Sequence, residues 1–248
     1  PIPFSEIAAD LRATPPSSYP DAIRQIFRVC AQKQGKSRYG NKSPVHVRGL
    51  PMLAELFPEA RFIHIIRDGR NVALSYMDVD FGPSTIEGGA LRWRRHVTDG
   101  RKAGATLGPE RYREVRYEHL IDDPESAIRD LCGFIGIAFD ERMLRYYERS
   151  EQLYPGRQTP DHHRNLARPP TKGMRSWREE MTAAQVAMFE AVAGGLVEEL
   201  GYERGAPRAG PGRRLRAKAR LIALRIQAGM RRVGLSKRKP SGGARKRD

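Results

Sequence analysis

The most informative segment of this 248-residue chain is Phe62-Ile-His-Ile-Ile-Arg-Asp-Gly-Arg-Asn-Val-Ala-Leu-Ser75. Its apolar start, residues 61–66, is typical of a short buried strand in a parallel sheet, and Asp68-Gly69 turns the chain into a helix from about Asn71. A strand that turns through a glycine into a helix directs free backbone N–H groups and the positive end of the helix dipole to one place. The segment therefore predicts a phosphate site, with Arg67 binding two oxygens and the Ser75 hydroxyl facing the same anion.

The same spacing allows a simpler interpretation. Arg67 and Asp68 would then form a structural ion pair, and Ser75 would be an ordinary helix residue. An Arg-Asp-Gly tripeptide alone does not decide between the two interpretations.

A second strand-to-helix unit follows along the chain. Residues 112–117 predict a strand, Asp123 is an N-cap with Pro124 at the first helical position, and the helix ends near Gly136. The alternation of strand, helix, strand and helix predicts an α/β fold, a three-layer sandwich with a central parallel sheet.

Other segments are predicted to surround this unit. Helical spacing covers residues 19–34, 52–57 and 139–147, and Thr182 with Gln185 forms a capping box for a last helix that Gly201 closes. Residues 150–170 are polar and without a period, which predicts a loop that faces the substrate.

The charge of the chain is divided very unevenly. Residues 204–248 hold 16 of the 45 Lys and Arg residues and one acid, Asp248, so this tail carries +15 and the rest only +1. We therefore predict a folded domain over residues 1–203 and a basic tail over residues 204–248. The total of +16 resembles that of a nucleic-acid-binding protein, but a nearly neutral domain makes nucleic acid the less favoured partner.

Within the tail, residues 213–235 place apolar side chains among Arg and Lys at roughly helical spacing. This pattern is typical of an amphipathic helix on an anionic membrane surface or a partner. Arg-rich termini are also often solvated without a specific role, so three alternatives remain open: membrane, nucleic acid and no specific partner.

Several classes of protein do not fit the sequence. No apolar run is long enough for a membrane helix, and the first residues lack the pattern of a signal peptide. Cys30 and Cys132 fall in helical segments, which favours reduced, packed thiols over a disulfide or a metal site. We expect a cytoplasmic location, with peripheral membrane contact if the tail binds lipid, and no metal.

The motif around Arg67 resembles that of the sulfotransferases, which use 3'-phosphoadenosine 5'-phosphosulfate as sulfonate donor. In that family an apolar strand precedes Arg-Asp-Pro-Arg-(Asp/Asn)-Val, and a Ser lies eight residues after the first Arg. Here the match is Arg67 to Val72 with Ser75, and Gly69 stands where Pro is usual. The resemblance implies that Arg67 and Ser75 bind the 3'-phosphate of the donor.

Further family landmarks follow in order between about Gly40 and Tyr202. They are Asn41-Lys42-Ser43-Pro44, Trp93, Arg116-Tyr117-Glu118-His119-Leu120 with Asp123-Pro124, Thr171-Lys172-Gly173 and Gly201-Tyr202. The resemblance implies that Lys42 stabilises the leaving group, that Tyr117 lies by the adenine, and that Lys172 and Gly173 close over the donor phosphates.

One landmark of the family is missing. Its members begin with a strand and a Gly-rich loop that holds the 5'-phosphosulfate through backbone N–H groups, and no such loop precedes Tyr19. The resemblance thus implies a P-loop-like sulfotransferase fold without its first strand, loop and helix, and without a carboxylate that serves as general base in related enzymes.

The sequence therefore predicts transfer of a sulfonate to a hydroxyl or amine of a small molecule, glycan, lipid or protein. Catalysis would rest on positioning and cationic stabilisation. His162 and His163 fit acceptor binding or plain solvation better than a metal site. Two alternatives remain: a nucleotide-binding remnant of the family without catalysis, and a membrane- or nucleic-acid-binding protein that acts through its tail.

Overall fold

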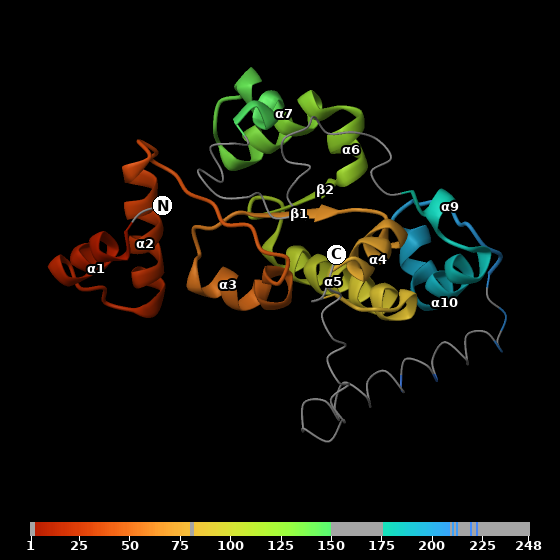
Figure 1. Ribbon diagram of the computed structural model, residues 1–248. Helices are drawn as coiled ribbons and strands as arrows, with labels where there is room; N and C mark the ends of the chain where they lie inside the picture. The colour runs from red at the N-terminus through yellow and green to blue at the C-terminus, as the bar shows by residue number, and fades with distance from the viewer. Residues whose placement is uncertain are drawn as a thin grey trace, which may run out of the picture. The chain divides into compact units, whose positions relative to one another are not determined.

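The computed structural model describes residues 3–79, 82–149 and 176–208, together with residues 210, 212, 219 and 222. The chain divides into two compact units, of which the first comprises residues 1–64 and 99–114 and the second residues 65–98 and 115–248. The elements, labelled in Figure 1, are α1 (Phe4–Ala13), α2 (Tyr19–Lys33), η1 (His46–Gly49), α3 (Leu50–Leu56), β1 (Phe62–Ile66), α4 (Gly69–Met77), α5 (Ile86–Leu107), β2 (Tyr112–Arg116), α6 (Tyr117–Asp122), α7 (Pro124–Ile135), η2 (Glu141–Arg149), α9 (Trp177–Glu180) and α10 (Ala183–Glu199).

The two predicted strands pair with each other. Strands β1 and β2 form a two-stranded parallel sheet, and the N–H of Phe62 donates to the carbonyl of Arg111 at 2.8 Å. In Figure 1 the helices α6 and α7 lie on one side of the strands and α4 on the other. The prediction of an α/β fold with a parallel sheet between helices is confirmed.

The burial of β1 differs from the prediction. We expected a strand buried on both faces, but Ile63 and Ile65 are 41% and 53% exposed, whereas Ile66 is buried. Since side chains alternate along a strand, residues 62, 64 and 66 share one face and residues 63 and 65 the other. Only the first face turns inward, so the apolar run correctly predicted a strand but not its exposure.

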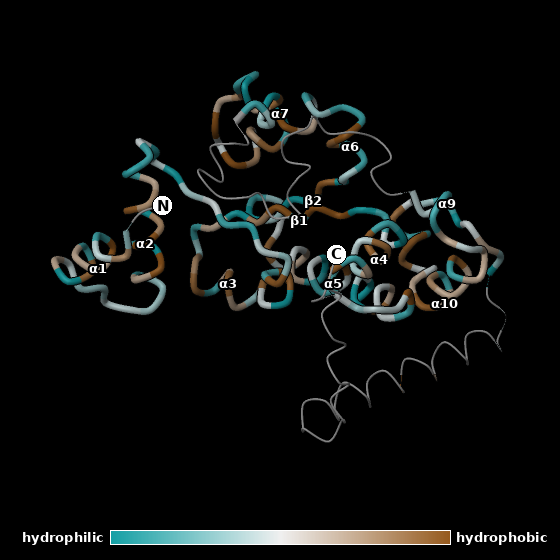
Figure 2. Tube along the Cα trace, viewed as in Figure 1, coloured by the Kyte–Doolittle hydropathy of each residue, from teal (hydrophilic) through white to brown (hydrophobic). Residues whose placement is uncertain are grey.

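The second unit holds the larger apolar core. Helix α10 supplies much of it, and Figure 2 shows how hydrophobic α10 and β1 are. Phe189 is fully buried and its ring centroid lies 5.8 Å from that of Trp93 on α5. Each large side chain buried in this way stabilises the fold by about 1.5–3 kcal/mol. This core lies directly beneath the turn between β1 and α4.

The first unit has a smaller core. Leu50, Ala103 and Tyr112 form it, with Phe62 and Leu107 packed against them. The guanidinium of Arg111 donates to the carbonyls of Ala54 and Phe57 at 3.0 and 3.1 Å. It thereby satisfies carbonyl groups at the C-terminal end of α3 that lack partners within the helix.

The predicted helix ends are largely confirmed. Asp123 accepts from the N–H of Ser126 as N-cap of α7, and Gly136 ends that helix with the left-handed φ of 69°. Thr182 and Gln185 form the predicted capping box. The segment predicted as a helix over residues 139–147 is instead a 3-10 helix, η2.

Beyond Tyr202 the chain keeps contact with the second unit. The carbonyl of Glu203 accepts from Arg70 at 2.8 Å, and the N–H of Gly205 donates to Glu190 at 2.7 Å.

Of the two cysteines, Cys132 is buried and neither forms a disulfide. Among the described helices, none is both long and apolar enough to cross a bilayer.

Candidate functional site

The turn from β1 into α4 lies in the second unit, and Arg67, the residue predicted to bind phosphate, directly precedes it. Asp68 is the N-cap of α4, and its carboxylate accepts from the N–H of Arg70 at 2.9 Å. Gly69 is the next residue, and a Cβ at this position would lie 2.3 Å from the Trp93 ring. In this chain, a side chain at position 69 would collide with the aromatic ring.

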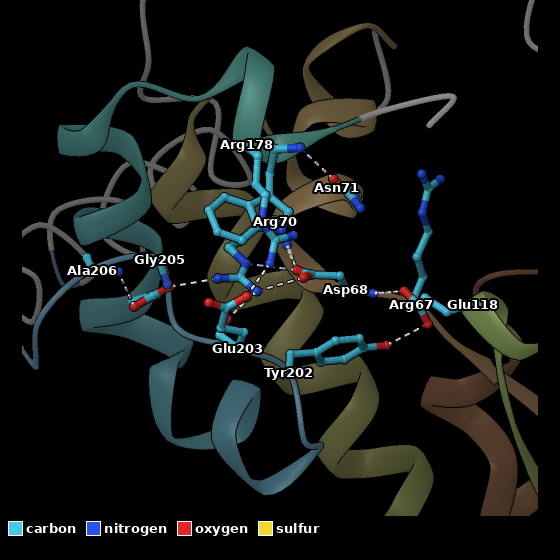
Figure 3. A network of polar contacts seen from close by, with 12 residues as sticks. Arg67, Asp68, Arg70, Asn71, Glu118, Arg178, Tyr202, Glu203, Gly205 and Ala206 are labelled. Atoms are coloured by element: carbon cyan, nitrogen blue, oxygen red, sulfur yellow. Dashed lines mark hydrogen bonds and ion pairs between the residues drawn. The ribbon is translucent and has the colours of Figure 1, made fainter. Parts of the chain in front are cut away.

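Arg67 is the residue directly before this turn. Its side chain is half-buried, and its guanidinium carbon lies 4.6 Å from the ring centroid of Tyr117, the first residue of α6. Figure 3 shows Arg67 pointing away from the buried polar residues of α4 and α10. A guanidinium held against an aromatic face keeps its charge and its donor groups, because the ring contacts only the face of the plane.

Ser75 lies on α4, two turns beyond Arg67. Its hydroxyl donates to the carbonyl of Asn71 at 3.1 Å, the bond that serines in the middle of helices often make. The side chain is half-buried. Binding of a phosphate would require the hydroxyl proton to leave this carbonyl, so a shared anion at Arg67 and Ser75 stays a prediction.

The backbone N–H groups of the turn correct one part of that prediction. We expected them to be free for an anion, but the N–H of Asp68 donates to Glu118 at 3.0 Å and that of Arg70 to the side chain of Asp68. Carboxylates of the protein occupy these donors because a helix N-terminus attracts negative charge. Of the two arginine side chains described at this turn, Arg67 is half-buried and Arg70 is buried.

The partner of Asp68 also differs from the alternative interpretation. That interpretation expected an ion pair between Asp68 and Arg67. The carboxylate of Asp68 instead forms an ion pair with the guanidinium of Arg70, at 2.7 Å. Arg70 also forms an ion pair with Glu190, at 2.8 Å. Its guanidinium carbon lies 3.7 Å from the ring centroid of Trp177. The second arginine of the motif is thus a structural residue, and its contacts are drawn in Figure 3.

A second carboxylate, Glu118, joins the turn to the C-terminal segment. Its Oε1 accepts from Asp68 and its Oε2 accepts from the hydroxyl of Tyr202 at 3.0 Å (Figure 3). Burial, and then the negative charge of Glu118, raise the pKa of Tyr202. The phenol therefore stays protonated and keeps donating at neutral pH.

The other predicted site residues belong to the first unit or to segments that are not described. Lys42 is exposed in an irregular segment of the first unit, whereas Arg67, Ser75 and Tyr117 belong to the second. Lys172, Gly173, His162 and His163 lie outside the described residues, as does most of the 213–235 segment. Within the described ranges, no group of three or more His, Cys, Asp or Glu side chains is placed to hold a metal ion.

Sequence reasoning missed the residues that support the turn, of which Glu190 is the most informative. Glu190 is buried between Phe189 and Val192 on α10, and it accepts from Arg70 and Gly205. One signal was available: an acid within an otherwise apolar helical run is rarely buried without a cationic partner. The sequence could not show which of many arginines supplies that partner.

Comparison with protein families identifies the family of this chain. A model described as the sulfotransferase family matches residues 5–141, more than half of the chain. This range contains the β1–α4 turn, Trp93 and Glu118.

Curated proteins with similar sequences carry related names. The omega-hydroxy-beta-dihydromenaquinone-9 sulfotransferase Stf3 of Mycobacterium bovis is 27% identical over 222 residues, which cover 83% of this chain and 52% of that protein. The protein-tyrosine sulfotransferase of Drosophila melanogaster is 26% identical over 134 residues, which cover 51% of this chain and 27% of that protein. The chain thus spans about half or less of the length of these relatives.

A solved structure has a similar fold. The sulfotransferase domain from the Synechococcus PCC 7002 olefin synthase aligns with a TM-score of 0.55 and 22% identity, over 79% of this chain and 74% of that one. This likeness concerns the fold.

Proposed function

The chain belongs to the sulfotransferase family, and on this basis we propose that it transfers a sulfonate group from 3'-phosphoadenosine 5'-phosphosulfate to a hydroxyl or amine of an acceptor. The single observation that carries the proposal is the placement of Arg67. Its guanidinium is half-buried against Tyr117 at the end of a parallel strand, where α/β proteins bind their ligands.

The residues of the turn fit a nucleotide with a 3'-phosphate. Arg67 offers a planar set of N–H donors that bind two phosphate oxygens at once. The neighbouring ring of Tyr117 offers an apolar face of the kind on which bases stack. Ser75, on the helix α4 that follows the turn, supplies a hydroxyl for the same phosphate in this proposal.

The reaction itself needs little covalent help from the protein. The acceptor oxygen or nitrogen attacks sulfur, the bond from sulfur to the bridging oxygen of the donor breaks, and adenosine 3',5'-bisphosphate leaves. The acceptor proton passes to a base, and negative charge grows on the bridging oxygen. A cation near that oxygen lowers the barrier, and in this proposal Lys42 is that cation, with Lys172 and Gly173 contacting the donor phosphates.

Of the two kinds of acceptor group in this proposal, the hydroxyl has the more support. The names of both relatives specify one, an omega-hydroxyl on a menaquinone in one and a protein tyrosine in the other.

The tail of +15 adds a second part to the proposal, since its basic charge and apolar residues over 213–235 suit the surface of an anionic membrane. The protein would then work in the cytoplasm and reach its acceptor at that surface.

The nucleotide site is tested by binding. Adenosine 3',5'-bisphosphate should raise the melting temperature of the protein, and Arg67→Ala should remove that rise. Arg129→Ala is a matched control, because Arg129 also lies over an aromatic ring, at 3.8 Å from the centroid of Phe139, but on α7. This control should keep the thermal shift. A wild-type protein that does not respond to the nucleotide would refute the proposed donor.

Transfer and membrane binding need their own measurements. Labelled sulfonate should move from the donor to an acceptor hydroxyl, whereas nucleotide binding without any transfer would favour the non-catalytic alternative.

Membrane binding is tested by sedimentation with vesicles. Vesicles that contain phosphatidylglycerol should sediment the full chain but not a chain that ends at Arg208. Equal binding of both chains, or of neutral vesicles, would exclude the membrane role of the tail.

A further inference from the structure

We propose that Glu118 and Trp93 are positioning residues for Arg67, because they hold the two sides of the peptide bond that follows it. This inference rests on the proposed function, in which Arg67 binds the 3'-phosphate of a nucleotide. It assigns a role to two residues of the family motifs that do not themselves reach the ligand in that proposal.

The clamp acts on one peptide group. The indole N–H of Trp93 donates to the carbonyl of Arg67 at 3.0 Å, and Oε1 of Glu118 accepts from the N–H of Asp68 at 3.0 Å. This carbonyl and this N–H belong to the same planar unit, in which they point in opposite directions. Two bonds on opposite sides therefore fix the orientation of the peptide plane.

Both partners of the peptide are themselves fixed. Trp93 is buried in the core of the second unit against Phe189. Glu118 uses its second oxygen to accept from the hydroxyl of Tyr202, as Figure 3 shows. The guanidinium carbon of Arg116 lies 4.8 Å from the centroid of the Tyr202 ring. The position of the peptide thus depends on α5, α6 and the segment after α10 together.

The consequence concerns the side chain of Arg67. A rotation of the peptide plane changes the ψ angle of Arg67, and a long side chain turns a small change at its Cα into a displacement of its guanidinium. Charge-assisted, two-point binding of phosphate depends strongly on such geometry. Tyr117, which lies against the guanidinium, precedes Glu118 in the chain, so the same turn of α6 holds the backbone and the side chain of Arg67.

The test compares two nucleotides that differ only in the 3'-phosphate. Calorimetry would measure the affinity of adenosine 3',5'-bisphosphate and of adenosine 5'-monophosphate for wild type, Arg67→Ala, Glu118→Ala and the double variant. We expect Glu118→Ala to weaken the bisphosphate at least about tenfold, the effect of losing one charge-assisted bond. The monophosphate should bind within about twofold of wild type.

The double variant distinguishes positioning from a general loss of stability. If Glu118 acts through Arg67, the double variant should bind the bisphosphate as Arg67→Ala alone does, because coupled residues are not additive. Glu118→Gln should restore most of the affinity, since the amide oxygen can still accept from Asp68. Losses that are equal for both nucleotides, or that add fully to that of Arg67→Ala, would overturn the inference.

A protein that prefers neither nucleotide in its wild-type form refutes the proposed function, and the inference falls with it. A preference that survives Glu118→Ala refutes the inference alone. Should Glu118→Ala fail to fold, Tyr202→Phe gives the answer, because it keeps the ring beneath Arg116 and removes only the hydroxyl that orients Glu118. Its loss should again be confined to the bisphosphate, and an unchanged preference would overturn the inference.

Discussion

Arg70 donates to the carboxylate of Glu190 at 2.8 Å, and both side chains are only 1% exposed. The two residues are 120 positions apart, so this pair joins the start of α4 to the middle of α10. Asp68, Arg204 and the N–H of Gly205 complete the charges and bonds around it. A buried pair of this kind is held by its partners, and removal of either member leaves a charge without compensation.

We therefore expect Glu190→Gln to lower the free energy of unfolding by about 3–5 kcal/mol, the range for breaking a buried pair. The measurement is denaturant unfolding at neutral pH. Glu125→Gln is the control, because its pair with Arg129 at 2.7 Å is about half exposed on both sides and exposed pairs contribute less than about 1 kcal/mol. Equal effects of the two substitutions would mean that the network around Arg70 does not hold the fold.

Gly69→Ala should destabilise the protein, because the new Cβ would lie 2.3 Å from the ring of Trp93. Overpacking of this kind costs about 1–3 kcal/mol. Gly133→Ala on α7 is the matched control, since no heavy atom lies within 4 Å of its Cβ and alanine favours a helix by up to about 1 kcal/mol. Thermal unfolding of both variants should show opposite shifts, and a neutral Gly69→Ala would mean that the Trp93 ring moves freely.

His64 predicts a dependence of stability on pH in the first unit. Burial lowers the pKa of His64 from its ordinary value of 6.5, and the nearby positive charge of Arg101 also lowers it against the opposing effect of Glu114. The unfolded chain then binds a proton at a pH at which the folded protein does not, so the free energy of unfolding decreases as the pH falls through about 6.5. Above that value the contribution is constant.

The test is denaturant unfolding of wild type and His64→Asn between pH 8 and pH 5, roughly the window over which a histidine titrates. Asparagine can keep a bond to the hydroxyl of Tyr112, which lies 2.6 Å from Nδ1 of His64. The decrease toward acid pH should be smaller in the variant than in wild type. Parallel curves for the two proteins would show that His64 does not titrate differently in the folded and unfolded states.

Local signals in the sequence predicted the elements of the site well. The Asp68-Gly69 turn, the N-cap Asp123 and the capping box of Thr182 are each determined by neighbours within a few residues, and the structure has all three. Arg67 could be singled out for the same reason. The expected role of Ser75 beside it, binding the same anion, stays a prediction, because the hydroxyl donates to the carbonyl of Asn71 within its own helix.

Contacts between distant segments were beyond the sequence. No residue near Arg70 in the sequence marks it as buried, yet it is, because Glu190 lies opposite it in the fold. The occupied N–H of Asp68 was missed likewise, since its acceptor, Glu118, lies 50 residues along the chain on α6. The exposure of Ile63 and Ile65 depends on what covers the sheet, which an apolar run does not specify.

Asn71 makes another contact between distant segments. Its Oδ1 accepts from the N–H of Trp177 at 2.8 Å and so fixes the start of α9 to α4. An aspartate at this position would carry an oxygen at the same place. An acid near the N-terminus of α4 is also favoured by the helix dipole.

Asn71→Ala should therefore lower the free energy of unfolding by about 1–3 kcal/mol, because the N–H of Trp177 loses its acceptor. Asn71→Asp should stay within about 1 kcal/mol of wild type, since it keeps the acceptor and gains from the dipole. Thermal unfolding and the fluorescence of Trp177 and Trp93 would report both effects. If the alanine and aspartate variants were equally unstable, the amide N–H₂ group of Asn71 and not its oxygen would be the group that matters.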